Sequence, residues 1–268
     1  MPIETSFFGP KLLLGSGQVE RYCIGMKMLP VPSVEANLDR DAARVVWIGA
    51  ILIAAAIAAL AADTLVRRTL NLDRLPGDLR KILSLSELFA HGVGVVLAGW
   101  CVWQMSPGFR RCLPRLFACA LLPGLAANVL KFSVCRLRPS FFVEQLPHSI
   151  FDTWIAGFPD VLSTRETYGT YFASSFPSGH AATAFGLAIG LSWLYPAGRA
   201  PFFTFATLAT IQRIASGAHW LSDALVGAAL AVLIAGSLTS STRVARAFAR
   251  FEVGRNAVRI AEQPRQAA

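Results

Sequence analysis

Residues 174–194 read SSFPSGHAATAFGLAIGLSWL, so a short polar turn leads directly into an uncharged apolar run. A second apolar run follows and ends in a polar cluster, in which Arg213 precedes His219 by six positions and Asp223 lies four positions further on. Each of the two apolar runs therefore has polar residues at one end. This arrangement predicts membrane helices that carry functional groups at their ends.

A third polar cluster lies upstream, where Lys131 and Arg138 stand seven positions apart and Pro139 follows directly. Seven residues make close to two helical turns, so the two basic side chains can share one helix face. Ionisable groups beside apolar membrane segments are costly and are usually functional. The three clusters therefore predict one phosphate-handling site at a membrane face.

The composition indicates a membrane protein. Of the 268 residues, 54% are hydrophobic and 15% are charged, whereas soluble domains carry about 25% charged residues. The net charge of +9 is explained by basic residues that flank membrane segments and contact anionic lipid. The sequence has no basic and aromatic stripe of the kind found in nucleic-acid-binding modules, so no nucleic-acid partner is expected.

Six apolar segments predict an all-α fold, a polytopic membrane bundle with six transmembrane helices, since about 20 apolar residues cross a bilayer. The segments are residues 45–62, 88–109, 116–130, 179–198, 200–212 with an extension past the arginine, and 224–242.

The same segments divide the chain into an N-terminal cytoplasmic arm (1–43), a six-span domain (44–242) with an extracytoplasmic loop (132–177), and a basic cytoplasmic tail (243–268). The side that holds both termini carries 15 Lys and Arg residues against 10 on the other. The positive-inside rule then predicts that both termini are cytoplasmic and that the site faces away from the cytoplasm. The loop is expected to form a partly ordered cap near the site.

The turn before the fourth segment is suited to bind an anion. Ser178 and Gly179 precede a predicted helix, so their backbone N–H groups can point at a bound anion, which the helix dipole also favours. His180 stands in the first helical turn, beside whatever binds there. His91, near the start of the second segment, is interpreted as a packing residue.

His219 and Asp223 predict a nucleophile and its orienting carboxylate. Residues four apart share one helix face, so the carboxylate can accept the Nδ1–H of the ring and leave Nε2 free to attack. Arg213, Lys131 and Arg138 supply three positive charges that can bind phosphoryl oxygens.

This order of residues resembles the type 2 phosphatidic acid phosphatase superfamily, which shares its core with vanadium haloperoxidases. The resemblance spans roughly residues 85–240, and the third motif of that family usually begins Ser-Arg where this chain has Gln212. The matching motifs are Lys131-x6-Arg138-Pro139, Pro177-Ser178-Gly179-His180 and Arg213-x5-His219-x3-Asp223.

The resemblance implies a phosphatase that needs neither a metal nor another cofactor and works through a phosphohistidine. His219 would be the nucleophile, Asp223 its orienter, and His180 the group that protonates the leaving oxygen and later activates water. The implied phosphate-binding residues are Lys131, Arg138, Ser178, Gly179 and Arg213.

The expected substrate is a phospholipid or a polyprenyl or other lipid phosphate in a bacterial inner membrane. Undecaprenyl pyrophosphate, phosphatidylglycerophosphate, phosphatidic acid and lipid A phosphate all remain candidates. Three alternatives stay open: transfer of the phosphoryl group between lipids, vanadate-dependent halide oxidation, which the apolar segments disfavour, and a non-catalytic lipid-binding or transport protein.

Overall fold

A computed structural model describes residues 31–142, 146–157 and 160–241, together with positions 244, 247, 248 and 252 of the tail. Most of the predicted cytoplasmic arm and most of the predicted basic tail lie outside the described residues.

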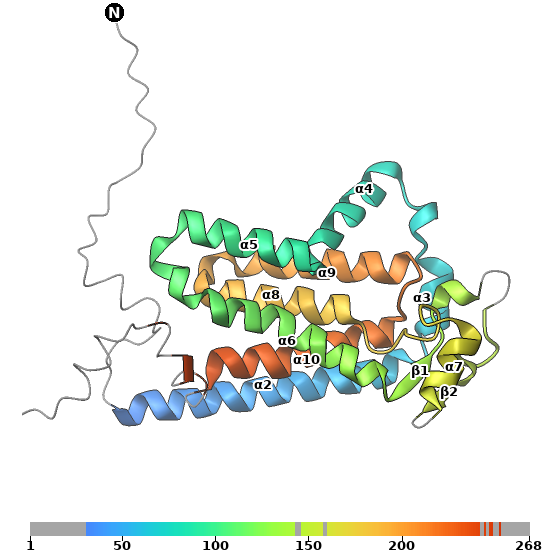
Figure 1. Ribbon diagram of the computed structural model, residues 1–268, viewed down its shortest axis with the longest axis horizontal. Coiled ribbons are helices and arrows are strands. Elements are labelled where there is room, and N and C mark those ends of the chain that lie inside the picture. Colours follow the sequence, from blue (N-terminus) through green and yellow to red (C-terminus); the bar gives the residue numbers. More distant parts are fainter. Residues whose placement is uncertain are drawn as a thin grey trace, which may run out of the picture.

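The structure is a helical bundle built around α8, which is buried along most of its length (Figure 1). Helices α6, α9 and α10 pack against α8, and α2 packs along α10. The long helices are α2 (Val31–Ala59), α5 (Gly92–Met105), α6 (Leu113–Lys131), α8 (Gly179–Leu194), α9 (Arg199–Ala215) and α10 (Leu221–Ser240).

Each of the six predicted apolar segments overlaps one of these helices. Among the described residues, three stretches are long and apolar enough to cross a membrane, and a bent pair of helices makes a possible fourth. The three stretches are Ala42–Ala59, Pro107–Lys131 and Leu221–Ser240. Helices α8 and α9 have 16 and 17 residues, or about 24–26 Å at 1.5 Å per residue. That is less than the roughly 30 Å of a hydrocarbon core, and six complete spans remain a prediction.

The helix boundaries differ most from the prediction at two places. Helix α2 begins at Val31, so the last part of the predicted arm is helical. The second predicted segment is broken, because Gly77–Ala90 and Gly92–Met105 meet at 74°. His91 has extended backbone angles there and separates the 3-10 helix η2 (Glu87–Ala90) from α5.

Small residues let the central helices approach closely, as in many membrane bundles. A Cβ on Gly227 of α10 would lie 2.3 Å from the carbonyl oxygen of Ser178. A Cβ on Gly186 of α8 would lie 2.2 Å from the carbonyl oxygen of Cys119 on α6. Glycine at these two positions therefore keeps α8 tightly between its neighbours.

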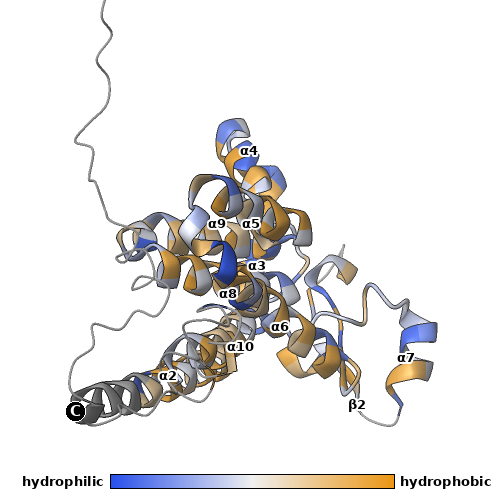
Figure 2. Ribbon diagram, turned by 60° about the vertical axis from the view of Figure 1, so that its left-hand side comes forward, coloured by the Kyte–Doolittle hydropathy of each residue, from blue (hydrophilic) through white to orange (hydrophobic). Residues whose placement is uncertain are grey.

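Short elements lie at one end of the bundle. Before α5 they are α3 (Asp63–Thr69), η1 (Leu72–Arg74) and α4 (Gly77–Ser86). The predicted cap contains a two-stranded antiparallel sheet. Its elements are β1 (Val134–Arg136), η4 (Pro139–Phe141), η5 (Ile150–Thr153), β2 (Trp154–Gly157) and α7 (Val161–Tyr168). Figure 2 shows hydrophilic residues in α4 and α7, which both lie outside the apolar bundle.

Candidate active site

The helix ends that carry the predicted site residues meet at one end of the bundle (Figure 1). There α6 and α9 end and α8 and α10 begin, next to α3 and the cap, while α2 begins and α10 ends at the opposite end. His219 lies close enough to four site residues to feel their charges. These are Arg138, Lys131, Arg213 and His180, which come from separate segments of the chain. The three sequence clusters therefore form one group in space.

His219 lies in the turn between α9 and α10 and is 1% exposed. Its Nδ1 atom lies 2.7 Å from the backbone carbonyl oxygen of Ser175. A carbonyl oxygen can only accept, so Nδ1 must carry the proton. The neutral ring then has its lone pair on Nε2, as a nucleophile requires.

Asp223 lies close to His219 but does not accept its Nδ1–H. The carboxylate oxygen Oδ2 is 4.0 Å from Nδ1, and it accepts instead from the Ser175 hydroxyl at 2.6 Å and the Trp220 backbone N–H at 3.0 Å. The expected direct contact assumed that both residues lie on one helix face, whereas α10 begins at Leu221 and His219 precedes it. Asp223 therefore positions Ser175, whose carbonyl group orients the ring.

Arg136 is a site residue that the sequence interpretation missed. It is fully buried and donates to the carboxylates of both Asp63, at 2.8 Å, and Asp223. It also donates to the hydroxyl groups of Ser222, at 2.8 Å, and Thr153, at 3.1 Å. Its backbone carbonyl accepts from the Ser175 N–H at 3.0 Å. The sequence offered one signal for Arg136, which is its position two residues before Arg138. No carboxylate lies near it in sequence, so its ion pairs could not be predicted.

The turn at the start of α8 is held in a different way from the prediction. The Ser178 N–H donates to the carbonyl oxygen of Asp223 at 3.1 Å, so it is not available to a bound anion. The Ser178 Oγ caps α8 by accepting from the Ala181 N–H at 3.3 Å. Its hydroxyl hydrogen can still be donated to a ligand. Gly179 and His180 form the first turn of α8, where the helix dipole favours an anion.

Both arginines of the predicted site present buried N–H groups that have no partner among the described residues. These are Nε and Nη1 of Arg138 and Nε of Arg213. The Arg138 guanidinium stacks 4.1 Å from the ring centre of Tyr171 in the cap, and Arg213 is paired with the carboxylate of Glu87. A buried donor without an acceptor costs free energy, and the oxygens of a bound phosphate would supply acceptors.

The buried position of His219 leads to a pH prediction. Burial lowers the pKa of His219 well below its usual value, and the nearby basic side chains lower it further. Below about pH 6.5 the unfolded chain therefore takes up a proton at this residue that the folded protein does not. The free energy of unfolding should then fall with decreasing pH by up to about 1.4 kcal/mol per unit more than in a His219→Asn variant. Thermal unfolding in detergent at a series of pH values checks this, and parallel curves for the two proteins would contradict it.

Comparison with known proteins identifies the class. Residues 113–246 match the model of the PAP2 superfamily, which covers α6 to α10 and all of the predicted site residues. The chain belongs to this superfamily.

Particular relatives match over shorter regions. A lipid A 1-phosphatase of Rhizobium etli is 30% identical over 114 residues, which is 42% of this chain and 43% of that protein. A lipid A 1-phosphatase of Porphyromonas gingivalis is 43% identical over 67 residues, 23% of this chain and 15% of that protein. The chain thus spans less than half the length of these relatives. The crystal structure of Aquifex aeolicus LpxE aligns with a TM-score of 0.48 and 22% identity, over 66% of this chain and 93% of that one.

Proposed function

We propose that this protein hydrolyses a phosphate monoester or diphosphate on a membrane lipid, without a metal and through a phosphohistidine intermediate. The observation that carries the proposal is the state of His219. Its Nδ1–H is held by the Ser175 carbonyl group, so Nε2 has a free lone pair beside a set of cations. The unpartnered N–H groups of Arg138 and Arg213 support a phosphoryl group as the ligand.

In the first step, Nε2 of His219 attacks phosphorus and the bond from phosphorus to the lipid oxygen breaks. The negative charge of the bound phosphoryl group favours the protonated form of His180. The protonated ring gives its proton to that oxygen, so the lipid leaves as an alcohol from a monoester or as a monophosphate from a diphosphate. Fixed positive charges near the equatorial oxygens stabilise the transition state. The Ser175 carbonyl group keeps accepting the Nδ1–H while the ring becomes positively charged.

In the second step, neutral His180 takes a proton from water and the oxygen of that water attacks phosphorus. The bond from nitrogen to phosphorus breaks, its electron pair returns to Nε2, and inorganic phosphate leaves. Both histidines are then in their starting states. Asp223 acts through Ser175 in both steps, because its carboxylate accepts from the Ser175 hydroxyl.

The substrate proposed first is a lipid A phosphate, because the relatives that align are named lipid A 1-phosphatases. The charge count and the six apolar segments support a placement in the membrane. We propose six spans, an inner-membrane location, cytoplasmic termini and an extracytoplasmic site. The site and the start of α2 lie at opposite ends of the bundle, which supports this orientation (Figure 1).

The test is phosphate release by the purified protein in detergent, with excess chelator, from a panel of lipid A, phosphatidic acid, phosphatidylglycerophosphate and undecaprenyl pyrophosphate. We expect release from at least one lipid, with lipid A as the preferred substrate. Absence of release from every member would contradict the proposal. A phosphorylated second lipid in place of free phosphate would indicate phosphotransfer by the same site.

A further inference from the structure

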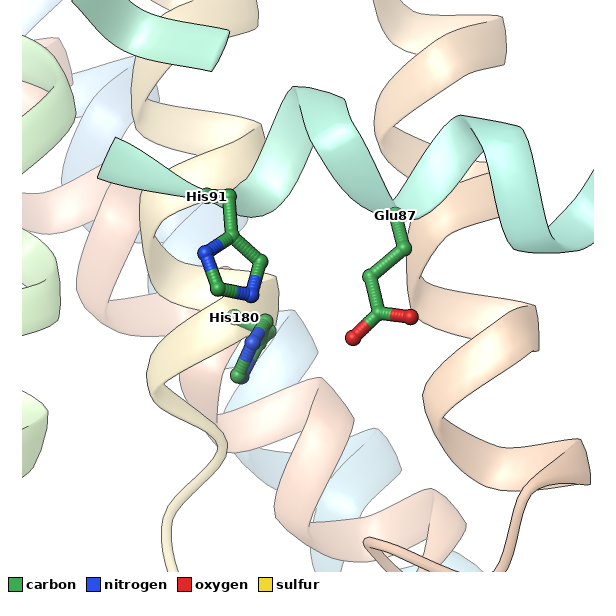
Figure 3. Close-up of side chains that lie close together, drawn as sticks. All are labelled: Glu87, His91 and His180. Atoms are coloured by element: carbon green, nitrogen blue, oxygen red, sulfur yellow. The ribbon is translucent and has the colours of Figure 1, made fainter. Parts of the chain in front are cut away.

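A carboxylate and two imidazoles gather beside the phosphate site. Figure 3 shows Glu87 and His91 projecting toward His180 of α8. One ligand atom from each of the three residues lies within 4.8 Å of the other two, and in the described part of the chain no other group of three or more such side chains meets this criterion. The rings of His91 and His180 contact edge to face, with centroids 5.2 Å apart.

The fold brings these residues together by the break in the second apolar segment. Glu87 opens η2, and His91 stands at the bend of 74° between η2 and α5. The bend places both side chains beside the first turn of α8. His91 is exposed, so the described residues leave the group open to an ion from outside.

Existing contacts leave ligand atoms available. Glu87 uses Oε1 to accept from Arg213, and within the described residues Oε2 has no hydrogen-bond partner. The His91 side chain has neither an ion pair nor a hydrogen bond to any described residue. Its ring contact with His180 leaves both imidazole nitrogens without a hydrogen-bond partner among the described residues. The interpretation of His91 as a packing residue therefore explains its position incompletely.

We propose that Glu87, His91 and His180 form a binding site for a divalent transition-metal ion such as Zn²⁺, and that the ion inhibits the enzyme. Two imidazoles and a carboxylate are a ligand set that Zn²⁺ commonly takes, with a fourth position left for water or a phosphate oxygen. Ligand atoms around a tetrahedral zinc ion lie about 3.3 Å apart, given bonds of about 2.0–2.1 Å. Rotation of the exposed His91 side chain can bring its ring nitrogen closer to the ligand atoms of Glu87 and His180.

Inhibition follows from what the ion would occupy. A metal bound to His180 uses the lone pair that must accept a proton from water, and it prevents the ring from carrying a proton to the leaving oxygen. The ion also draws Glu87 away from Arg213. The neighbouring charges of Arg213, Lys131 and Arg138 act on His180 and repel a cation. Binding to the free enzyme should therefore be reversible by a chelator.

The experiment uses the full-length protein in detergent and three forms: wild type, His91→Asn and His148→Asn. His148 is the matched control, because it is exposed and lies outside the group. Zn²⁺ binding is measured by calorimetry and Co²⁺ binding by its visible absorption. Phosphate release is measured across a Zn²⁺ titration and again after chelation. The inhibition arm rests on the proposed function, whereas the binding arms do not.

We expect wild type and His148→Asn to bind the ion and to lose activity reversibly. His91→Asn should keep its activity in the absence of metal, while its affinity for Zn²⁺ falls by at least about tenfold, since even outer-shell changes cost that much. Equal binding by wild type and His91→Asn, or no saturable binding by wild type, would overturn the site. Binding that depends on His91 but leaves phosphate release unchanged would overturn the inhibition. If wild type releases no phosphate at all, the proposed function fails while the binding arms still decide the site.

Discussion

Replacement of His219 by Asn is expected to lower phosphate release from the preferred lipid by at least about 10³-fold, as removal of a catalytic nucleophile does in other covalent enzymes. The side-chain amide of Asn can still donate to the carbonyl oxygen of Ser175, which accepts from Nδ1 at 2.7 Å in the wild type. The substitution therefore removes Nε2 while retaining the contact that orients the residue. The loss should appear in kcat, because the nucleophile acts in the chemical step.

The phosphorylated intermediate provides an independent readout. Rapid quenching of wild type with labelled substrate should trap a phosphate on the protein that is labile in acid and stable in base, as a bond from phosphorus to nitrogen is. His219→Asn should show no such label and an unfolding temperature close to that of wild type at neutral pH. Wild-type turnover by the variant, or an undiminished label, would refute the assignment of His219 as the nucleophile.

Replacement of Arg136 by Met is expected to destabilise the protein by about 3–5 kcal/mol, the usual cost of removing one member of a buried ionic group. Arg136, Asp63 and Asp223 each have side chains that are 0% exposed. The methionine would leave two carboxylates facing each other without a cation. It would also release the Asp223 carboxylate that holds Ser175, so the residual activity of the folded fraction should fall as well.

The matched control is Arg80→Met, which removes an exposed ion pair with Asp73 at 3.8 Å. Exposed pairs contribute only about 0–1 kcal/mol, so this variant should unfold close to wild type. A second variant, Arg136→Met with Asp63→Asn, removes one of the two facing charges and should recover part of the lost stability. Equal unfolding temperatures for Arg136→Met and Arg80→Met would show that the buried group does not support the fold. Thermal unfolding in detergent provides the measurement.

The helical class and most of the candidate site could be predicted from the sequence. Uncharged apolar runs can satisfy their backbone hydrogen bonds in a bilayer only as helices, so the six segments predicted where the long helices lie. Lys131, His180 and Arg213 were recognisable because polar groups at the ends of apolar runs need a function. Arg138 was recognised by its spacing of seven from Lys131, but α6 ends at Lys131 and Arg138 follows β1, so the expected shared helix face is wrong. The alternation of direction between consecutive segments then predicted that these residues meet at one end of the bundle.

Contacts between distant segments could not be predicted. Arg136 and Asp63 are 73 positions apart, and a buried ion pair of this kind depends on how β1 and α3 dock, which no local pattern encodes. The partner of the His219 ring was also decided by tertiary structure. The i, i+4 rule applies inside a helix, whereas α10 begins after His219, so the carbonyl group of Ser175 takes the place assigned to Asp223.

The sequence by itself determined which segments are helices and which polar residues stand at their ends, because both follow from hydrophobicity and spacing along the chain. Only the tertiary structure decided which groups contact each other at that end. These include the Arg136 group behind the nucleophile and the approach of Glu87 and His91 to His180. The physical reason is that hydrogen bonds and ion pairs depend on differences of about 1 Å between atoms, and only the packing of whole helices sets those distances.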